Sequence, residues 1–329
     1  MAGDTAPPPS HPAIRLVPWR GAEGRDRLAS WRSNVGAPVA LDLMRAEPRA
    51  PLTSLAVLSW NLWIGHGRLE EVVRRIRETT DAPLVALVQE AYRSDETLPA
   101  RAARRADRWA AGGFRSRARP RGDIVQAARA LSLNLRYVPS MRNGTGPSDR
   151  GNAILSDLPL GETWAFELPL VLQRRVPIEA TILLPGGPLH LVSAHLDPRG
   201  PPGATWLGVA GRARQTEYLV GQLGGDLAVL GADLNLGRGR RERSWRLLHQ
   251  AAFVTGVPAV VPPWTHTFHA TPRLTLDYVL LRDRTGRLAH ARVDRMDEHA
   301  RDGGPTVFGS DHHPLLARLD FRPHAGSHP

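Results

Sequence analysis

The sequence predicts a layered protein in which β-sheets lie inside and α-helices cover them. Several short segments are continuously apolar, and strands of that kind need cover on both faces. The clearest are LAVLSW at 55–60, LVALV at 84–88 and LAVLGA at 227–232. The segment 68–79 places its apolar residues on one helical face. Hydrophobic residues make up 42% of the chain and charged residues 23%, which is typical of a globular protein.

The remaining elements follow from the same patterns of apolar residues. Further strands are expected at 152–156, 176–184, 189–194, 276–281 and 315–321. Helices are expected at 212–223 and 242–251, with a mostly helical, Arg-rich region between Glu90 and about 134. The strands are short and numerous, so sheets dominate the predicted core.

The two ends of the chain differ from its middle in composition. Residues 1–53 are rich in Pro, Arg and Ala without a sustained period, which predicts a flexible N-terminal arm. The predicted strands and helices occupy residues 54–322, where we expect the folded domain. Residues 323–329 carry no periodic pattern and are expected to be a frayed tail.

The charge of the chain favours an anionic partner. Its 43 basic residues are all Arg and outnumber 32 acidic residues, for a net charge of +11. The guanidinium group of Arg binds phosphate oxygens in a bidentate manner. A chain that uses only Arg and is rich in Ala, Gly and Pro is, however, also what a GC-rich genome encodes. The absence of Cys excludes disulfides, thiol nucleophiles and thiolate metal sites. No signal peptide or membrane-spanning run is visible, so we expect a cytoplasmic protein.

Polar residues that bind metals or move protons stand where the apolar strands end. They are Asn61, Glu90, His195, Asp233 with Asn235, and Asp311 with His312, the last two directly before a strand. Strand ends are where clefts form in layered proteins. This recurrence is the main functional signal in the sequence.

Each of these residues taken singly has an ordinary structural explanation as well. Asn61 and Glu90 offer hard oxygen ligands suited to Mg²⁺ or Mn²⁺, but a Glu after a strand is often solvated or caps a helix. Asp233 and Asn235 lie on one side of an extended chain, where they could share a phosphate, but the same residues also form turns.

Histidines and one strand carboxylate form a second set of candidates. Asp277 lies in an apolar strand and needs a partner, for which His312 and an Arg are the alternatives. His312 and His313 are neighbours that point apart in extended chain, so only one of them is expected in a given cleft. His266 and His269 hint at a metal, but without other spaced ligands their signal is weak.

Seven short motifs follow one another along the chain. They are Trp60-Asn61, Gln89-Glu90, Gly151-Asn152-Ala153-Ile154-Leu155-Ser156, Ala194-His195-Leu196-Asp197, Gly231-Ala232-Asp233-Leu234-Asn235, Leu276-Asp277-Tyr278 and Ser310-Asp311-His312. In this order they resemble the endonuclease/exonuclease/phosphatase (DNase I-like) superfamily, from about residue 55 to 321. The combination is specific although each motif alone is not.

The resemblance implies an α+β fold with one domain rather than the two suggested by 329 residues. That fold is a four-layer α/β/β/α sandwich, in which two mixed, mainly antiparallel sheets lie face to face with helices outside. It also implies a phosphoesterase cleft at one sheet edge. Its catalysis needs no covalent intermediate, because a metal-oriented water attacks the phosphorus.

By the same resemblance, Asn61 and Glu90 form a site for Mg²⁺, or Mn²⁺, to which Asp311 contributes through water. Asp233 orients or deprotonates the attacking water. Asn235 contacts the phosphate or holds Asp233.

The histidines complete the site that the resemblance implies. His195 and His312 donate hydrogen bonds to phosphoryl oxygens, and Asp277 orients His312. Both Asp233 and His312 stand near the phosphate, so either is a candidate base.

Arginines near these motifs are the candidate substrate contacts. The predicted substrate-binding residues are Asn152, Arg150, Arg175, Arg238 and Arg241, with Arg174, Arg240, Arg243 and Arg246 beside them. Arg-lined clefts attract polyanions by steering and counterion release. A helical stripe at Arg101, Arg104, Arg105 and Arg108 and the loop residues Trp206 and Trp264 are further candidates, each with a purely structural alternative.

The sequence leaves three functions open. A nuclease or other phosphodiesterase acting on nucleic acid is favoured, and a hydrolase of lipid or inositol phosphates is the alternative. The segments Asn61-Leu62-Trp63 and Glu90-Ala91-Tyr92-Arg93 lack the Asp and Lys usual in apurinic endonucleases, which disfavours an abasic-site enzyme. A non-catalytic binding module is disfavoured because every motif is occupied. No obligate protein partner is evident.

Overall fold

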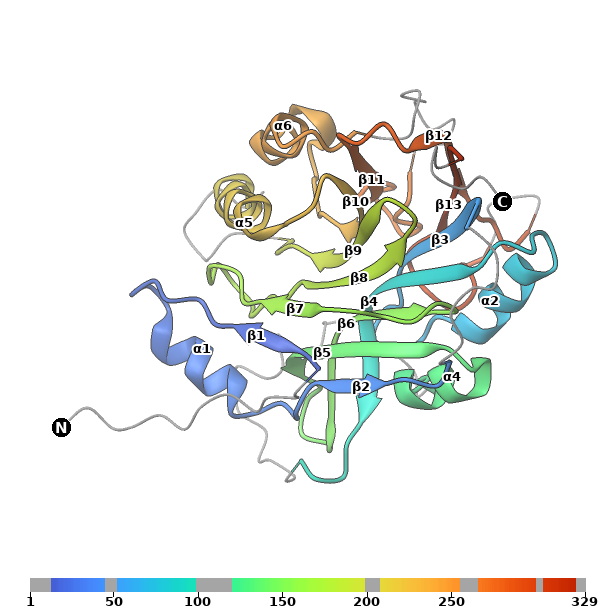
Figure 1. Ribbon diagram of the computed structural model, residues 1–329. Coiled ribbons are helices and arrows are strands. Elements are labelled where there is room, and N and C mark those ends of the chain that lie inside the picture. Colours follow the sequence, from blue (N-terminus) through green and yellow to red (C-terminus); the bar gives the residue numbers. More distant parts are fainter. Residues whose placement is uncertain are drawn as a thin grey trace.

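Two β-sheets lie against each other in the computed structural model, with helices on their outer faces (Figure 1). The structure describes residues 13–44, 52–98, 120–198, 208–254, 266–299 and 304–323. This arrangement is the four-layer sandwich expected from the sequence, and that prediction is confirmed. Among the helices of the described segments, none is both long and apolar enough to cross a membrane.

The first sheet has six strands and the second has seven. In spatial order the first contains β1 (Arg15–Val17), β7 (Thr163–Phe166), β8 (Ile178–Leu184), β9 (Gly187–His195), β10 (Leu227–Asp233) and β11 (Asp277–Asp283). The second contains β12 (Leu288–Arg295), β13 (Leu315–Phe321), β3 (Ser54–Asn61), β4 (Leu84–Ser94), β6 (Ser148–Ser156), β5 (Asn134–Arg142) and β2 (Val39–Leu41). Most pairings are antiparallel, but β1 with β7, β3 with β4 and β9 with β10 are parallel.

Three apolar layers hold the sandwich together. Between the sheets, Val57 and Leu87 of the second sheet share one cluster with Val229 of the first. The outer face of the second sheet is covered by α2 (Leu69–Arg77) and α4 (Ile124–Leu131). The outer face of the first sheet is covered by α5 (Val209–Gln222) and α6 (Arg243–Gln250), which the short helix η1 (Gly239–Arg241) precedes. Burial on both faces explains why the central strands are continuously apolar.

The N-terminal segment differs from the expectation of a flexible arm at 1–53. Within it, β1 pairs in parallel with β7, and β2 pairs with β5. The helix α1 (Arg25–Arg32) buries Leu28 completely. Residues 13–44 therefore belong to the fold, and the prediction is wrong for them. Their strands are three residues long and depend on partners far along the chain, so no local pattern reveals them.

Other boundaries shift for similar reasons. The region expected to be mostly helical after Glu90 begins with a continuation of β4 to Ser94 and includes α4 from Ile124, and its residues 99–119 lie outside the described residues. The strands β5, β7 and β12 were not expected from the sequence. Residues 324–329 of the expected tail lie outside the described residues.

A close approach of the two sheets positions the polar strand ends. At Gly231 in β10, a Cβ atom would lie 2.8 Å from Ser59 Oγ and 2.9 Å from Leu87 Cβ, so only glycine fits without a shift. Beside it, Gln89 Nε2 donates to Ser193 Oγ (3.1 Å) and to Gly231 O (3.2 Å). The carboxyl ends of β3 and β4 are thereby held against those of β9 and β10.

Candidate active site

Strand register brings three predicted site residues to one edge of the first sheet. Asp233, the last residue of β10, pairs with His195 at the end of β9 and with Asp277 at the start of β11. All three side chains are at least nine-tenths buried. Residues separated by up to 82 positions thus meet because neighbouring strands place their ends together.

A β-bulge directs Glu90 to the same edge from the second sheet. The register of β4 shifts between Val88 and Ala91, and Glu90 has a φ of 50°. Such a left-handed conformation is uncommon for a non-glycine residue and is typical of bulges that re-aim a side chain beside a site. Glu90 Oε1 lies 4.0 Å from His195 Nδ1, so the carboxylate faces the first sheet.

Asp233 is the centre of the cluster. Its Oδ2 accepts a hydrogen bond from Asn61 Nδ2 (2.9 Å) and lies 3.2 Å from His195 Nε2. Its Oδ1 accepts a hydrogen bond from the Asn235 backbone N–H (3.0 Å). Burial and the charge of Asp277 raise the pKa of Asp233 to about 7, against the opposing effect of His312. Asn235 meets Asp233 through its backbone, whereas its side-chain Nδ2 donates to Leu196 O (3.0 Å).

His312 and Asp277 make the contact that the sequence suggested. His312 Nδ1 lies 2.7 Å from Asp277 Oδ2, and no Arg pairs with Asp277 in the described segments. Burial lowers the pKa of His312, but the charge and hydrogen bond of Asp277 outweigh it and raise this pKa to about 10. His312 is therefore an imidazolium near neutral pH, with its Nε2 4.0 Å from Asp233 Oδ2.

Ser310 and Trp60 fix the loop that carries Asp311 and His312. Ser310 Oγ donates to Asn61 O (2.7 Å), and the His312 N–H donates to Ser310 Oγ (3.1 Å). Trp60 Nε1 donates to His312 O (2.8 Å). Both residues belong to motifs visible in the sequence, yet sequence reasoning assigned them no role because a hydroxyl and an indole carry no catalytic signature.

The carboxylates of this edge fit a hard divalent cation. Asp233 and Asp277 each offer a carboxylate oxygen, and these atoms lie within 4.8 Å of each other and of His312, whose protonated ring is not itself a ligand. Asp277 Oδ1 and Asp311 Oδ1 are buried with no hydrogen-bond partner among the described residues. Burial also raises the pKa of Asp311 to about 6. Oxygen donors without partners, in a site this acidic, suit Mg²⁺ or Mn²⁺.

One of the metal ligands expected from the sequence already makes a hydrogen bond within the protein. Asn61 Oδ1 accepts from the Trp63 N–H at 2.9 Å, which leaves one lone pair for a metal. Asp311 Oδ1 lies 3.8 Å from His312 Nε2, so it belongs to the same cluster. The described contacts of Glu90 and Asp311 are compatible with their predicted role as metal ligands.

Two buried arginines influence His195. Burial, followed by the charges of Arg175 and Arg150, lowers the pKa of His195 well below its usual value. Arg175 Nε bonds Asp197 Oδ1 at 3.0 Å, and Arg150 bonds Asn143 Oδ1 at 2.7 Å. His195 is therefore neutral near pH 7, in contrast to His312.

The candidate substrate contacts fall into two kinds. Asn152 Nδ2 donates to Val176 O at 2.8 Å, so this amide also serves the fold. Arg238 and Arg241 are exposed, three and six residues after Asn235. Arg174 is engaged with Glu167 (2.6 Å) and with the carbonyls of Pro139 and Ser140, so it is a structural residue. Arg101, Arg104, Arg105, Arg108, Trp206 and Trp264 lie outside the described residues.

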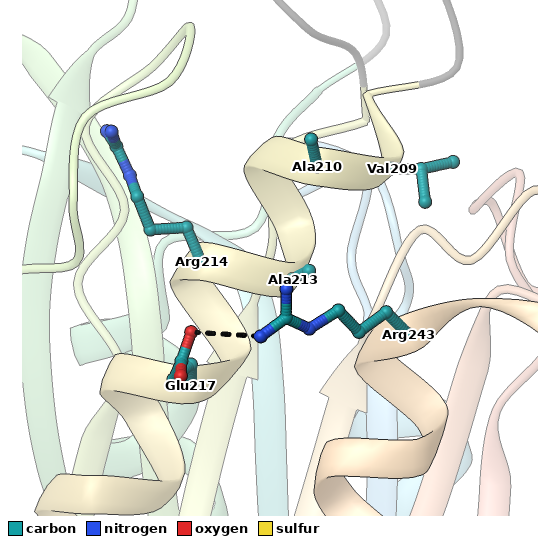
Figure 2. Close-up of a pocket in the computed structure, with 6 residues that line it drawn as sticks. All are labelled: Val209, Ala210, Ala213, Arg214, Glu217 and Arg243. Carbon is teal, nitrogen blue, oxygen red and sulfur yellow. Dashed lines mark ion pairs between the residues drawn. The ribbon is translucent and has the colours of Figure 1, made fainter.

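A surface hollow between α5 and α6 is separate from this cluster (Figure 2). It is lined by residues of the outer helical layer, including Arg214, Glu217 and Arg243. Arg243 and Glu217 form an ion pair of 3.7 Å across it, and both side chains are more than half exposed. None of the polar strand-end residues lines the hollow, so it is not part of the candidate active site.

A family model of the endonuclease/exonuclease/phosphatase family matches residues 58–312. The chain belongs to this family. The match spans every one of the seven motifs and confirms the resemblance drawn from them. The reactions for which the family is named all cleave phosphate esters. No curated protein sequence matches the chain.

Solved structures share the fold at low sequence identity. The endonuclease/exonuclease/phosphatase family protein from Leptotrichia buccalis C-1013-b has a TM-score of 0.54 at 13% identity, over 82% of this chain and 99% of that chain. Sphingomyelinase C from Streptomyces griseocarneus has a TM-score of 0.51 at 18% identity, over 81% and 99%. The human Nocturnin catalytic domain has a TM-score of 0.52 at 16% identity, over 87% and 97%.

Proposed function

We propose that this chain is a divalent-metal-dependent hydrolase of phosphodiesters and that nucleic acid is its favoured substrate. The observation that carries the proposal is the environment of Asp233. This buried carboxylate is held by Asn61 and the Asn235 backbone, has a pKa of about 7 and faces a protonated His312. General acid–base hydrolysis of a phosphate ester uses such a pair, in which the pKa of the base lies well below the pKa of the acid.

In this proposal Asp233 accepts the proton of the attacking water. A carboxylate whose pKa lies near neutrality combines availability with basicity. His312 is a poor base because Asp277 keeps it protonated, and its Nε2–H instead donates to a phosphoryl oxygen. The base left open by the sequence is therefore assigned to Asp233, and Asp277 acts as a positioning residue for His312.

The remaining polar residues hold the substrate and the metal. Asn61, Glu90 and Asp311 would hold Mg²⁺, which when bound supplies positive charge to stabilise the phosphoryl oxygens. His195 is neutral and keeps Asp233 in place from its other side, 3.2 Å away. Because its one N–H is directed at Asp233, the remaining Nδ1 of the neutral ring is an acceptor, so in this proposal His195 positions Asp233 and does not donate to a phosphoryl oxygen.

Exposed positive charge favours a polyanionic substrate. Five arginines that follow Asn235 are all exposed, namely Arg238, Arg240, Arg241, Arg243 and Arg246. A backbone of phosphates would gain from several of them at once, because each contact releases counterions. A single phospholipid headgroup offers fewer charges to the same surface.

A choline phospholipid is the second candidate, because sphingomyelinase C shares this fold. We therefore expect one of two substrates to be cleaved by the same residues. Purified protein is incubated with supercoiled plasmid and, in parallel, with sphingomyelin vesicles, each with Mg²⁺ or with EDTA. Plasmid nicking that needs Mg²⁺ supports the nuclease, and release of phosphocholine supports the sphingomyelinase-type reaction.

Contamination is controlled with variants purified identically. Asp233→Asn and His312→Ala should both lose the activity, whereas Asp226→Asn should retain it, because Asp226 is exposed and its described ion pair is a surface pair with Arg284 at 3.7 Å. Activity that survives in the first two variants would show that another protein or another site is responsible. Failure on both substrates would contradict the proposed substrates.

A further inference from the structure

Three buried histidines form a cluster outside the candidate active site. His266, His269 and His313 each direct one ring nitrogen to a common point, and these atoms lie within 4.8 Å of one another. Their exposed fractions are 7%, 6% and 0%. The proposed hydrolysis uses none of them, so their concentration at one point needs its own explanation.

Backbone pairing separates this cluster from the catalytic histidine. The His313 N–H donates to Thr267 O (2.8 Å) and the His269 N–H donates to Asp311 O (2.7 Å), so the two segments lie side by side. Neighbouring side chains of an extended segment point in opposite directions. His312 accordingly faces Asp277, and His313 faces His269, as the sequence pattern indicated.

Outer contacts determine which nitrogen of two rings carries a proton. His269 Nε2 lies 2.8 Å from Gly304 O, and a carbonyl only accepts, so Nε2 is protonated. His313 Nδ1 lies 2.9 Å from Asp297 Oδ1 and is protonated for the same reason. In the neutral rings the lone pairs are then on His269 Nδ1 and His313 Nε2, which are 3.2 Å apart. Two lone pairs that face each other at this distance are compatible with a shared proton or with a metal ion bound by both nitrogens.

We propose that His266, His269 and His313 bind a transition-metal ion of the Zn²⁺ class. Zn–N bonds of about 2.0–2.1 Å in a tetrahedron place two ligand nitrogens roughly 3.3 Å apart, close to the separation of His269 and His313. Imidazole nitrogens suit Zn²⁺ and its neighbours, whereas Mg²⁺ prefers oxygen. The carbonyl and carboxylate behind the two rings are the kind of partners that orient metal-bound histidines.

Arg295 and Asp297 are charged residues near the third histidine. Arg295 NH1 donates to His266 O (3.0 Å) and to His266 Nε2 (3.2 Å), so a metal ion would have to displace the guanidinium from the lone pair of this ring. The positive charge of Arg295 is offset by Asp297, whose Oδ1 lies 2.9 Å from Arg295 NH2. The site is thus not dominated by an uncompensated cation.

A metal ion bound here would hold the loop that carries Asp311 and His312 against the segment 266–269. The cluster joins residues 266–269 to His313, directly after Asp311 and His312, and through Asp297 to the end of β12. The site is structural in this proposal, and it holds whether or not the protein is a hydrolase. It also separates the metals by class, with Zn²⁺ at the nitrogen cluster and Mg²⁺ at the carboxylate cluster.

The test counts Zn²⁺ bound to the full chain. Protein stripped with a chelator and dialysed against buffer with excess Mg²⁺ is titrated with Zn²⁺, and bound Zn²⁺ is measured by elemental analysis. His269→Ala should bind about one equivalent less than the parent protein. His290→Ala should bind as much as the parent, because His290 is exposed and pairs with Asp320 at 3.8 Å. Co²⁺ substitution should give visible absorption in the parent and not in His269→Ala.

Two further measurements keep the proposal open to refutation. If His269→Ala does not fold, as judged by circular dichroism, His266→Ala replaces it, because that residue lies at the start of the segment. Zn²⁺ should also raise the melting temperature of the parent protein and not that of the variant. Equal Zn²⁺ binding in the parent and the folded His variant, or no binding in the parent, would overturn the proposal.

Discussion

Two regions of this protein bury ionised groups, and they do so in opposite ways. Beneath α5 and α6, Arg212 bonds Glu242 through contacts of 2.7, 2.9 and 3.0 Å, and both residues are about 1% exposed. At the sheet edge, Asp233, Asp277 and Asp311 share the protonated His312. The first region is a matched pair, whereas the second holds more negative charge than positive.

The difference indicates which region is structural and which is functional. Both oxygens of Glu242 have donors, so its burial is compensated within the fold. Asp277 Oδ1 and Asp311 Oδ1 have none among the described residues, and burial raises the pKa of Asp311 to about 6. Buried carboxylates that share a single positive charge are typical of sites that receive a cation or a proton during function.

The largest effect is expected at Asp233, the centre of the carboxylate cluster at the sheet edge. Asp233→Asn keeps the shape of the side chain but cannot accept the proton of water, so kcat should fall by about 10²–10⁴. Steady-state hydrolysis of the better substrate measures this, with Asp226→Asn as the matched change at an exposed carboxylate. A loss below about tenfold would contradict the role of Asp233 as the base.

Breaking the matched pair should instead cost stability. Arg212→Met leaves Glu242 buried without its guanidinium, which should lower the free energy of unfolding by about 3–5 kcal/mol. Chemical denaturation measures the change, and Arg246→Met, at an exposed position, is the control. The folded variant should keep the parent kcat. A large loss of kcat with unchanged stability would place this pair in the active site instead.

Removing the positioning carboxylate should change both rate and pH dependence. Asp277→Asn takes away the charge that raises the pKa of His312 to about 10. The pKa of His312 then falls, so the protonated donor is lost at a lower pH and the basic limb of the pH–rate profile moves to lower pH. We expect kcat to fall by about 10² at neutral pH. An unshifted profile would indicate that Asp277 supports only the fold.

A bound cation should relieve the excess charge of the site. At a Mg²⁺ concentration tenfold above its Kd, the free energy of unfolding should rise by about 1.4 kcal/mol. Thermal melting with and without Mg²⁺ tests this in the parent protein and in Asp311→Asn. The gain should shrink in the variant, whereas Asp226→Asn should behave like the parent. An equal gain in all three would place the Mg²⁺ elsewhere.

The smallest effect is expected where an ion pair is exposed. Arg243 and Glu217 lie 3.7 Å apart in the hollow of Figure 2, and water screens their attraction. Arg243→Ala should therefore change the free energy of unfolding by less than about 1 kcal/mol. If this arginine contributes to polyanion binding, KM for plasmid should rise and kcat should stay unchanged. The KM of this variant thus shows whether Arg243 contacts the substrate or only forms a surface ion pair.

Much of the candidate site was visible in the sequence because its signals are local. Asn61, Glu90, His195, Asp233 and His312 each interrupt or follow an apolar run. The cost of burying a lone carboxylate predicted a partner for Asp277, and the structure decided for His312 over an Arg. By contrast, the structural engagement of Arg174 with Glu167 could not be inferred, because an arginine beside a motif looks the same whether it binds substrate or an internal carboxylate.

The sequence by itself determined the layered class of the fold, the central strands and the order of the motifs, since apolar period and residue type are local properties. Only the tertiary structure decided that residues 13–44 join the sheets, that a bulge turns Glu90 towards His195, and that His266 and His269 meet His313. These features depend on strand pairing and on the approach of two sheets. Such contacts join residues far apart in the chain, and no local pattern records them.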